Sequence, residues 1–168
     1  MKTLLFINAC MRTGSRTQRI ADVVLAKLSG RYRVETIDLR DNTFSPVDNA
    51  VLEDRNEGIV PEIHMELARK IATADRIVIA APFWDLMFPA TLKTYLENIT
   101  ISGITFRYSE QGRPESLCKA KALHYVTTAG GYIAQNDFGF SYVKALAQNF
   151  FGITYKNLQK EITFSGTI

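Results

Sequence analysis

The sequence is poor in the features that mark several common protein classes. It has only two cysteines among 168 residues, Cys10 and Cys118, and their spacing matches no metal-binding or redox motif. We therefore expect two reduced thiols, as is typical of a cytoplasmic protein. No apolar run is long enough to cross a bilayer. The N-terminal stretch MKTLLFINACMRTGS leads directly into a loop, so we interpret it as a buried strand and not as a signal peptide.

An excess of charge of one sign is also lacking. The chain has 20 Lys and Arg against 17 Asp and Glu, a net charge of +3, and no basic run. This pattern excludes the basic footprint of a nucleic-acid-binding protein. Hydrophobic residues make up 46% of the chain and charged residues 22%, which excludes a disordered chain. We see no internal repeat and no low-complexity segment, and the length predicts a single domain over residues 1–168.

Buried-strand patterns alternate with helical patterns along the chain. We expect strands at 3–8, 33–39, 76–81, 121–128 and 153–158. The expected helices run from Ser15 to Gly30, from Pro61, from Pro89, and between the Gly130-Gly131 loop and Gly152. Residues 40–60 read as an irregular surface excursion and 103–118 as a short hairpin. This order predicts an α/β fold, a five-stranded parallel sheet of order 2-1-3-4-5 with helices on both faces.

Three loops gather the residues that could bind a ligand. In such a sheet, ligands bind beyond the carboxyl ends of the strands, where the strand order reverses. The loops expected at this edge are ACMRTGSRT (9–17), PFWDLMF (82–88) and TAGGYIAQ (128–135). The topology brings them to one crevice, which is the predicted site.

The first loop ends at a helix N-terminus that carries hydroxyl groups. Backbone N–H groups and the helix dipole favour an anion there. Ser15 and Thr17 could add donors, and Arg12 or Arg16 could add charge. The loop matches neither G-x-G-x-x-G nor the P-loop, which disfavours both of those sites. An ordinary helix cap with solvated arginines is an equally good interpretation.

The other two loops suit a flat ligand. Phe83 and Trp84 offer rings for stacking, although a hydrophobic plug at the end of the sheet is the alternative. Gly130 and Gly131 allow close approach of the backbone to a ligand, or form an ordinary turn. Neither His64 nor His124 has a visible catalytic partner, and the acidic residues show no metal spacing. We therefore predict no catalytic side chain and no metal site.

Three segments carry a family resemblance. They are PFWDLMFPATLKTYL (82–96), GITFRYSEQG (103–112) and TTAGG (127–131). The hairpin segment is the most specific of the three. With these segments the sequence resembles, over nearly the whole chain, the FMN-dependent NAD(P)H azoreductases and quinone reductases of the flavodoxin-like superfamily.

The resemblance implies a function and a set of site residues. One FMN per subunit would place its phosphate at Ser15 and Thr17, with Cys10 where the family often has serine. The cofactor-binding residues implied are Cys10, Ser15, Thr17, Pro82, Phe83, Trp84, Asp85, Leu86, Thr128, Ala129, Gly130 and Gly131. The reaction would be ping-pong hydride transfer from NADH or NADPH through FMN to a quinone or azo compound. The family works as a homodimer with the site at its interface. From the thiols, the charge and the lack of a long apolar run we expect a cytoplasmic protein that binds neither nucleic acid nor membrane.

The sequence departs from the family pattern in three places. Trp84 and Asp85 replace Tyr-Asn, Ala129 replaces an arginine, and the chain stops at Ile168, where relatives continue into a last helix. We expect a dimer to cover the apolar surface that this helix would otherwise cover. The alternative function is a one-electron carrier of the flavodoxin type, although such carriers are usually strongly acidic. A nucleotide- or phosphate-binding module without redox chemistry is a third reading.

Overall fold

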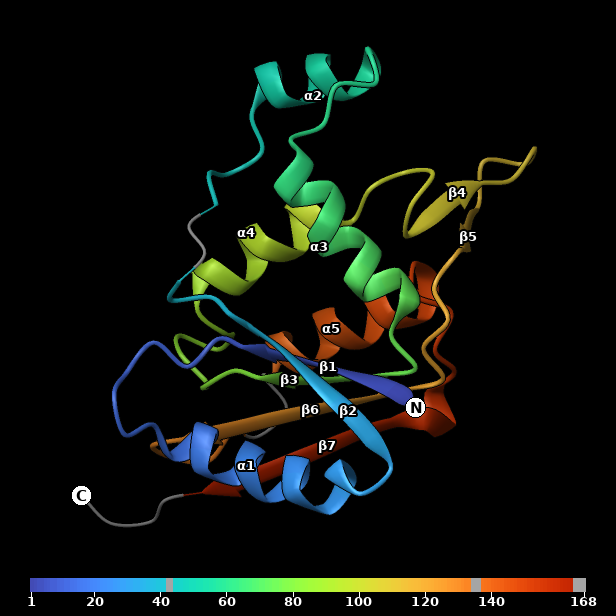
Figure 1. The fold of residues 1–168 in the computed structure, drawn as a ribbon. Helices are drawn as coiled ribbons and strands as arrows, with labels where there is room; N and C mark the ends of the chain where they lie inside the picture. Colours follow the sequence, from blue (N-terminus) through green and yellow to red (C-terminus); the bar gives the residue numbers. More distant parts are fainter. Residues whose placement is uncertain (42–43, 134–136, 165–168) are drawn as a thin grey trace.

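A parallel sheet of five strands lies at the centre of the protein in a computed structural model, which describes residues 1–41, 44–133 and 137–164 (Figure 1). Its order, β2-β1-β3-β6-β7, is the predicted 2-1-3-4-5 once the two hairpin strands are left out of the numbering. The strands are β1 (Lys2–Asn8), β2 (Tyr32–Asp38), β3 (Arg76–Ala80), β6 (Ala122–Ala129) and β7 (Leu158–Phe164). The predicted parallel architecture is therefore confirmed.

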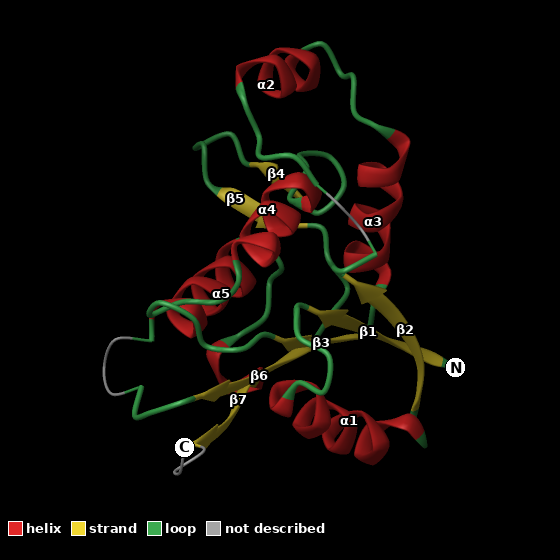
Figure 2. Ribbon diagram, turned by 90° about the vertical axis from the view of Figure 1, so that its left-hand side faces the viewer, coloured by secondary structure: helices red, strands yellow, loops and turns green. Residues whose placement is uncertain are grey.

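Helices cover both faces of the sheet, as predicted (Figure 2). Helix α1 (Arg16–Ser29) lies on one face, and α3 (Glu62–Thr73), α4 (Ala90–Ile99) and α5 (Phe138–Asn149) lie on the other. Alternate residues of β1 serve the two cores: Leu5 and Ile7 join the larger cluster under α3–α5, whereas Leu4 and Phe6 join the smaller cluster under α1. This alternation follows from the two-residue period of a strand.

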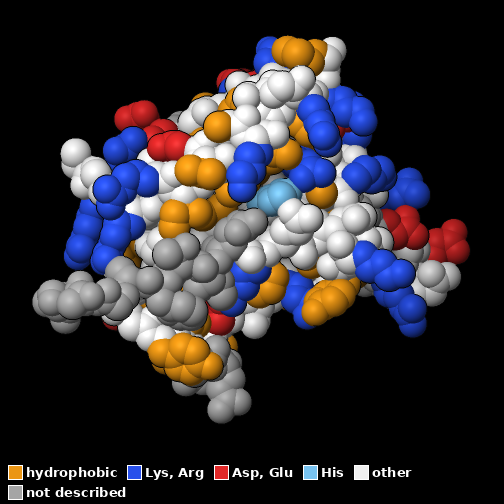
Figure 3. Space-filling model, turned by 90° about the horizontal axis from the view of Figure 1, so that it is seen from below, with side chains coloured by type: hydrophobic (Ala, Val, Ile, Leu, Met, Phe, Trp, Pro, Cys, Tyr) orange, Lys and Arg blue, Asp and Glu red, His pale blue; other side chains and the backbone are white. Residues whose placement is uncertain are grey.

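The face below the sheet, where α1 lies, carries mainly basic charge. Lys and Arg side chains are prominent there and acidic side chains are few (Figure 3). Helix α1 itself contributes Arg16, Arg19 and Lys27 against a single acidic residue, Asp22. No helix in the described part of the chain is long and apolar enough to cross a membrane.

The predicted surface excursion at 40–60 contains a helix that the sequence pattern did not reveal. Helix α2 (Asn49–Asn56) begins after Asp48, whose side chain accepts a hydrogen bond from the Val51 N–H. None of its residues is buried, so it has no apolar face and leaves no periodic pattern. Arg55 ties it to the rest of the protein by donating to the backbone carbonyl oxygens of Glu97 and Asn98. The prediction of a wholly irregular segment was wrong.

The last strand was predicted too early in the chain. Ile153 is buried, but its N–H donates to the Ala147 carbonyl of α5 at 3.0 Å. The buried Ile153 side chain therefore belongs to the segment that ends α5, and not to a strand. A single 3₁₀ turn at Tyr155–Asn157 follows, and β7 begins only at Leu158, which pairs with Leu123.

A short hairpin confirms the prediction for residues 103–118. Strands β4 (Phe106–Tyr108) and β5 (Pro114–Ser116) pair antiparallel. Gly112 has a φ of +71° in the turn, and its N–H donates to the Ser109 carbonyl.

A buried asparagine at the end of β1 fixes the loop that follows. Asn8 is 2% exposed, and its Nδ2 donates to Asp38 Oδ2 at 2.7 Å while its Oδ1 accepts from the Cys10 N–H. Arg40 also donates to the Asp38 carboxylate. The Arg40 hydrogen bonds, with help from Asn8, lower the pKa of Asp38 from 3.8 to about 2.

Gly152 is expected to be intolerant of a side chain. Its φ is +67°, and an added Cβ would lie 2.9 Å from Ser116 Cβ. Gly152→Ala should therefore lower the free energy of unfolding by about 1–3 kcal/mol. The matched control is Gly30→Ala, because Gly30 has right-handed geometry and open space around an added Cβ; that change should be neutral or add up to about 1 kcal/mol. Urea unfolding of both variants checks this, and equal stabilities would contradict it.

Asp38 should contribute a pH-dependent part of the stability. Its folded-state pKa is depressed, so its contribution is present above about pH 4 and is lost as pH falls toward about 2. Asp38→Asn should therefore lose less stability than the wild type between pH 4 and pH 2. Urea titrations across that range measure the effect. Asp54→Asn makes the same charge change at an exposed helix position and should follow the wild-type curve; if Asp38→Asn follows it too, the assignment fails.

Candidate functional site

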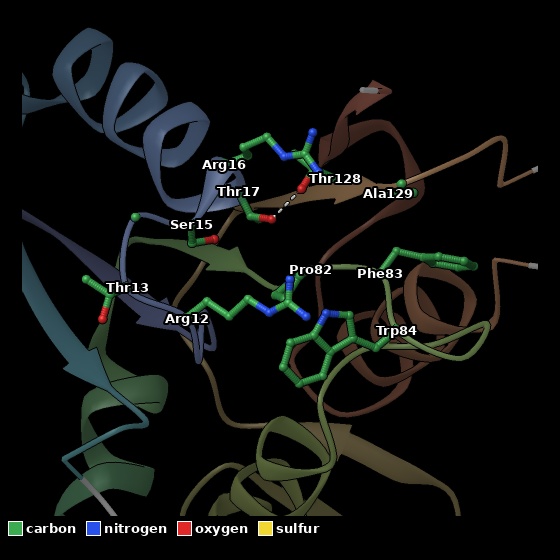
Figure 4. Close-up of a pocket in the computed structure, with 12 residues that line it drawn as sticks. Arg12, Thr13, Ser15, Arg16, Thr17, Pro82, Phe83, Trp84, Thr128 and Ala129 are labelled. Carbon is green, nitrogen blue, oxygen red and sulfur yellow. Dashed lines mark hydrogen bonds between the residues drawn. The ribbon is translucent and has the colours of Figure 1, made fainter. Parts of the chain in front are cut away.

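A pocket of about 460 Å³ opens at the carboxyl edge of the sheet, between the loops after β1, β3 and β6 (Figure 4). This is a usual size for a small-molecule site. Its lining residues are Arg12, Thr13, Gly14, Ser15, Arg16, Thr17, Pro82, Phe83, Trp84, Thr128, Ala129 and Gly130. The three loops singled out in the sequence thus meet at one site.

One end of the pocket is built from hydroxyl groups at the start of α1. Gly14 turns the chain with a φ of +68°, and Ser15 caps the helix by accepting from the Gln18 N–H. Thr17 is buried, and its Oγ1 lies 2.7 Å from Thr128 Oγ1, which ties α1 to the end of β6 (Figure 4). The first turn of α1 has no acidic residue. The helix N-terminus and its hydroxyls therefore suit an anion such as a phosphate.

The other end of the pocket is aromatic, with Phe83 and Trp84 in its wall. Trp84 and Met87 exchange two backbone hydrogen bonds of 2.8–2.9 Å, which closes a tight turn. Asp85 and Leu86 occupy the two positions inside this turn at φ values of 49° and 68°. Such values are uncommon for residues other than glycine. Both residues are exposed and do not line the pocket.

The third wall continues the sheet beyond its last regular pair. The Phe83 N–H donates to the Thr128 carbonyl at 2.9 Å, so the loop after β3 stays paired with the end of β6. Thr128, Ala129 and Gly130 line the pocket, whereas Gly131 does not. A Cβ added at Gly130 would meet no atom of the described residues within 4 Å. The space beside this glycine therefore remains open to a ligand.

Cys10 lies behind the pocket and not in its lining. Its side chain is 1% exposed, and its Sγ lies 3.8 Å from the Ala80 carbonyl oxygen. Burial raises the pKa of the Cys10 thiol. It is therefore protonated at neutral pH and poorly suited to act as a nucleophile.

The charge of the pocket is positive. Arg12 and Arg16 both line it, and no Asp or Glu is among the lining residues in the part of the chain that the structure describes. The Arg12 guanidinium carbon lies 5.9 Å from the centroid of the Trp84 ring, within the range of a cation–π contact. A cationic, hydroxyl-rich pocket with an aromatic wall is suited to a planar ligand that carries an anionic group.

The pocket thus contains part of the set of twelve residues predicted for FMN. Eight of them line it: Ser15, Thr17, Pro82, Phe83, Trp84, Thr128, Ala129 and Gly130. Cys10, Asp85, Leu86 and Gly131 do not. Thr13 and Gly14 also line the pocket and were not among the predicted residues. A glycine directly before a helix cap indicates a tight turn, and this signal could have identified Gly14.

The two histidines lie outside the pocket lining. His64 packs against Phe44, with ring centroids 5.7 Å apart, and burial lowers its pKa. His124 is buried, and its Nε2 lies 2.6 Å from Arg76 Nη1. Within residues 1–41, 44–133 and 137–164, no group of three or more metal-ligating side chains is found.

Curated proteins similar to this chain are named for FMN-dependent redox activity. A protein of Clostridium perfringens named FMN-dependent NADH:quinone oxidoreductase is 33% identical over 171 aligned positions, which cover 91% of this chain and 82% of that protein. FMN-dependent NADH:quinone oxidoreductase 2 of Clostridium acetobutylicum is 35% identical, covering 92% of this chain and 82% of its own length.

Solved structures show the same fold. An FMN-dependent NADH-azoreductase of Bacillus anthracis, determined in complex with FMN, has a TM-score of 0.81 at 24% identity and covers 98% of this chain and 87% of its own. The family model for the flavodoxin-like fold matches residues 2–158. By this match and by its curated relatives, the chain belongs to the flavodoxin-like family that includes the FMN-dependent NADH:quinone oxidoreductases.

Proposed function

We propose that the protein is an FMN-dependent NAD(P)H oxidoreductase that reduces quinones or azo compounds, with NADH or NADPH as the co-substrate. The observation that carries the proposal is the pocket in which a cationic helix N-terminus and an aromatic wall meet. The names of the relatives supply the substrate class. We further propose that residues 1–168 act as one cytoplasmic domain, without nucleic-acid or membrane partners.

FMN fits the chemistry of this pocket from end to end. Its phosphate would be held by Ser15, Thr17 and the free N–H groups of α1, with positive charge beside it. Its ring would lie along Phe83 and Trp84, with one edge at Thr128, Ala129 and Gly130, next to Pro82. Cys10, Asp85, Leu86 and Gly131 remain proposed neighbours, Cys10 behind the phosphate end and the others outside the lining. Bound FMN supplies the two-electron chemistry between NAD(P)H and the acceptor.

The side chains of this chain would bind and orient rather than transfer protons. Among the described residues that line the pocket, none is a carboxylate, histidine or cysteine, the side chains that usually act as general bases. The open space beside Gly130 leaves room for the cofactor edge. We propose that NAD(P)H and the acceptor use the same exposed side of the pocket in turn, which is a ping-pong order.

A homodimer is part of this proposal. Leu86, Tyr132 and Phe138 are 48%, 85% and 54% exposed, and the Phe138 N–H donates to the Leu86 carbonyl. Leu86 and Tyr132 lie on the loops after β3 and β6, and Phe138 begins α5 beside Leu86. A second copy of the chain would cover them and complete the acceptor side of the site.

Loss of the Ser15 hydroxyl should weaken FMN binding without weakening riboflavin binding. A hydrogen bond to a charged group is worth about 1.5–3 kcal/mol, so Ser15→Ala should raise the FMN dissociation constant about 10–150-fold. Riboflavin has no phosphate and should bind as it does to the wild type. Fluorescence titration of both flavins measures the difference. Ser29→Ala removes a hydroxyl at the other end of α1 and serves as the control; equal losses for both flavins in Ser15→Ala would rule out this phosphate position.

Steady-state kinetics should distinguish an enzyme from an electron carrier. The purified protein with FMN should oxidise NADH or NADPH continuously when a benzoquinone is present, and double-reciprocal plots at several quinone concentrations should be parallel. Omission of FMN should abolish this turnover. A protein that binds FMN and turns yellow, but oxidises neither nucleotide, would instead be a carrier. A protein that binds no flavin would be neither.

A further inference from the structure

The two arginines of the pocket lie at different places along it. Arg16 extends beside Thr128 at the hydroxyl end, whereas the Arg12 side chain runs between Ser15 and Trp84 toward the aromatic wall (Figure 4). Arg12 comes from the loop after β1 and Trp84 from the turn after β3. Their contact, 5.9 Å from guanidinium carbon to ring centroid, therefore bridges the two loops across the pocket.

The charge of Arg12 is available to a ligand. Arg33, Arg40, Arg69 and Arg107 each pair with a carboxylate. Arg12, by contrast, takes part in none of the ion pairs found within the described residues, and no carboxylate lines the pocket beside it. Its side chain is exposed at the pocket, so its orientation does not depend on burial in the core.

A guanidinium in this position suits the edge of a flat ring. It is planar, keeps its charge at all ordinary pH values, stacks on aromatic faces and donates hydrogen bonds in its own plane. The Arg12 guanidinium carbon lies over the Trp84 ring, 5.9 Å from its centroid, so the charge stands at the aromatic end of the pocket. A planar ligand that reaches Trp84 therefore comes within the field of this cation.

We infer that Arg12 places its positive charge at the ring end of bound flavin and favours the reduced form, whereas Arg16 acts on the phosphate. The inference rests on the proposed function. Hydride transfer from NAD(P)H moves two electrons and one proton to the flavin and leaves NAD(P)⁺. The reduced ring therefore carries one negative charge unless it takes a second proton from water. A cation near the ring binds this form more tightly than the neutral oxidised form.

The test is the midpoint potential of the bound flavin in two variants that remove the same charge. Arg12→Gln should lower the affinity for reduced FMN relative to oxidised FMN by about tenfold, which for a two-electron couple is a potential about 30 mV more negative. Arg12→Lys keeps the charge and should recover most of the shift. Arg16→Gln should leave the potential unchanged but weaken FMN binding about tenfold, with riboflavin binding unaffected.

The outcomes separate this inference from the proposed function. If Arg12→Gln binds FMN at the wild-type potential, or shifts it no more than Arg16→Gln does, Arg12 does not sense the charge of the ring and the inference is overturned, although the proposed function stands. If the wild-type protein binds no flavin, both are overturned. Thermal unfolding of each variant confirms that the exposed substitutions leave the fold intact.

Discussion

The parallel pairing of β1 between β2 and β3 is the constraint on which the site depends. The chain leaves β1 to form α1 on one face of the sheet, and β3 is followed by α4 on the other. The loops after these two strands therefore diverge and leave a crevice between them. Backbone pairing continues past the regular strands, because the Ala9 N–H donates to the Ala80 carbonyl and the Phe83 N–H to the Thr128 carbonyl. The bases of all three loops are thus fixed before any ligand binds.

The pocket separates two kinds of chemistry along its length. Hydroxyl groups and the dipole of α1 gather at one end, and aromatic rings form the wall at the other. No acidic side chain is among the described residues that line the pocket, so none of them neutralises the positive charge of the helix N-terminus and of the arginines. The order of elements in the chain explains these two ends. The N-terminus of α1 follows β1, and the turn that carries Phe83 and Trp84 follows β3.

The sequence predicted the buried strands and the order of the sheet, because their apolar runs follow directly from burial. A continuous apolar run such as residues 3–8 suits a strand that is covered on both faces. The apolar pattern was misleading in two places. Ile153 is buried at the end of α5 and not in a strand. Helix α2 has no buried residue, so it leaves no apolar pattern in the sequence. Similarly, the topology brought Ser15 and Trp84 to one pocket, but the contact between Arg12 and Trp84 depends on side-chain conformations that no sequence spacing encodes.

The turn after β3 shows how local strain can serve the site. Leu86 has a φ of 68°, a conformation that glycine adopts without strain but that costs other residues about 1–3 kcal/mol. Tight two-residue turns of this kind favour Asn-Gly, so Asp85-Leu86 is a poor choice for stability alone. The hydrogen bonds between Trp84 and Met87 hold the turn closed, and Phe88, the residue after Met87, is buried in the core. These hydrogen bonds and the buried Phe88 fix the turn on both sides, and they hold Trp84 at the wall of the pocket, where the guanidinium carbon of Arg12 lies 5.9 Å from its ring centroid.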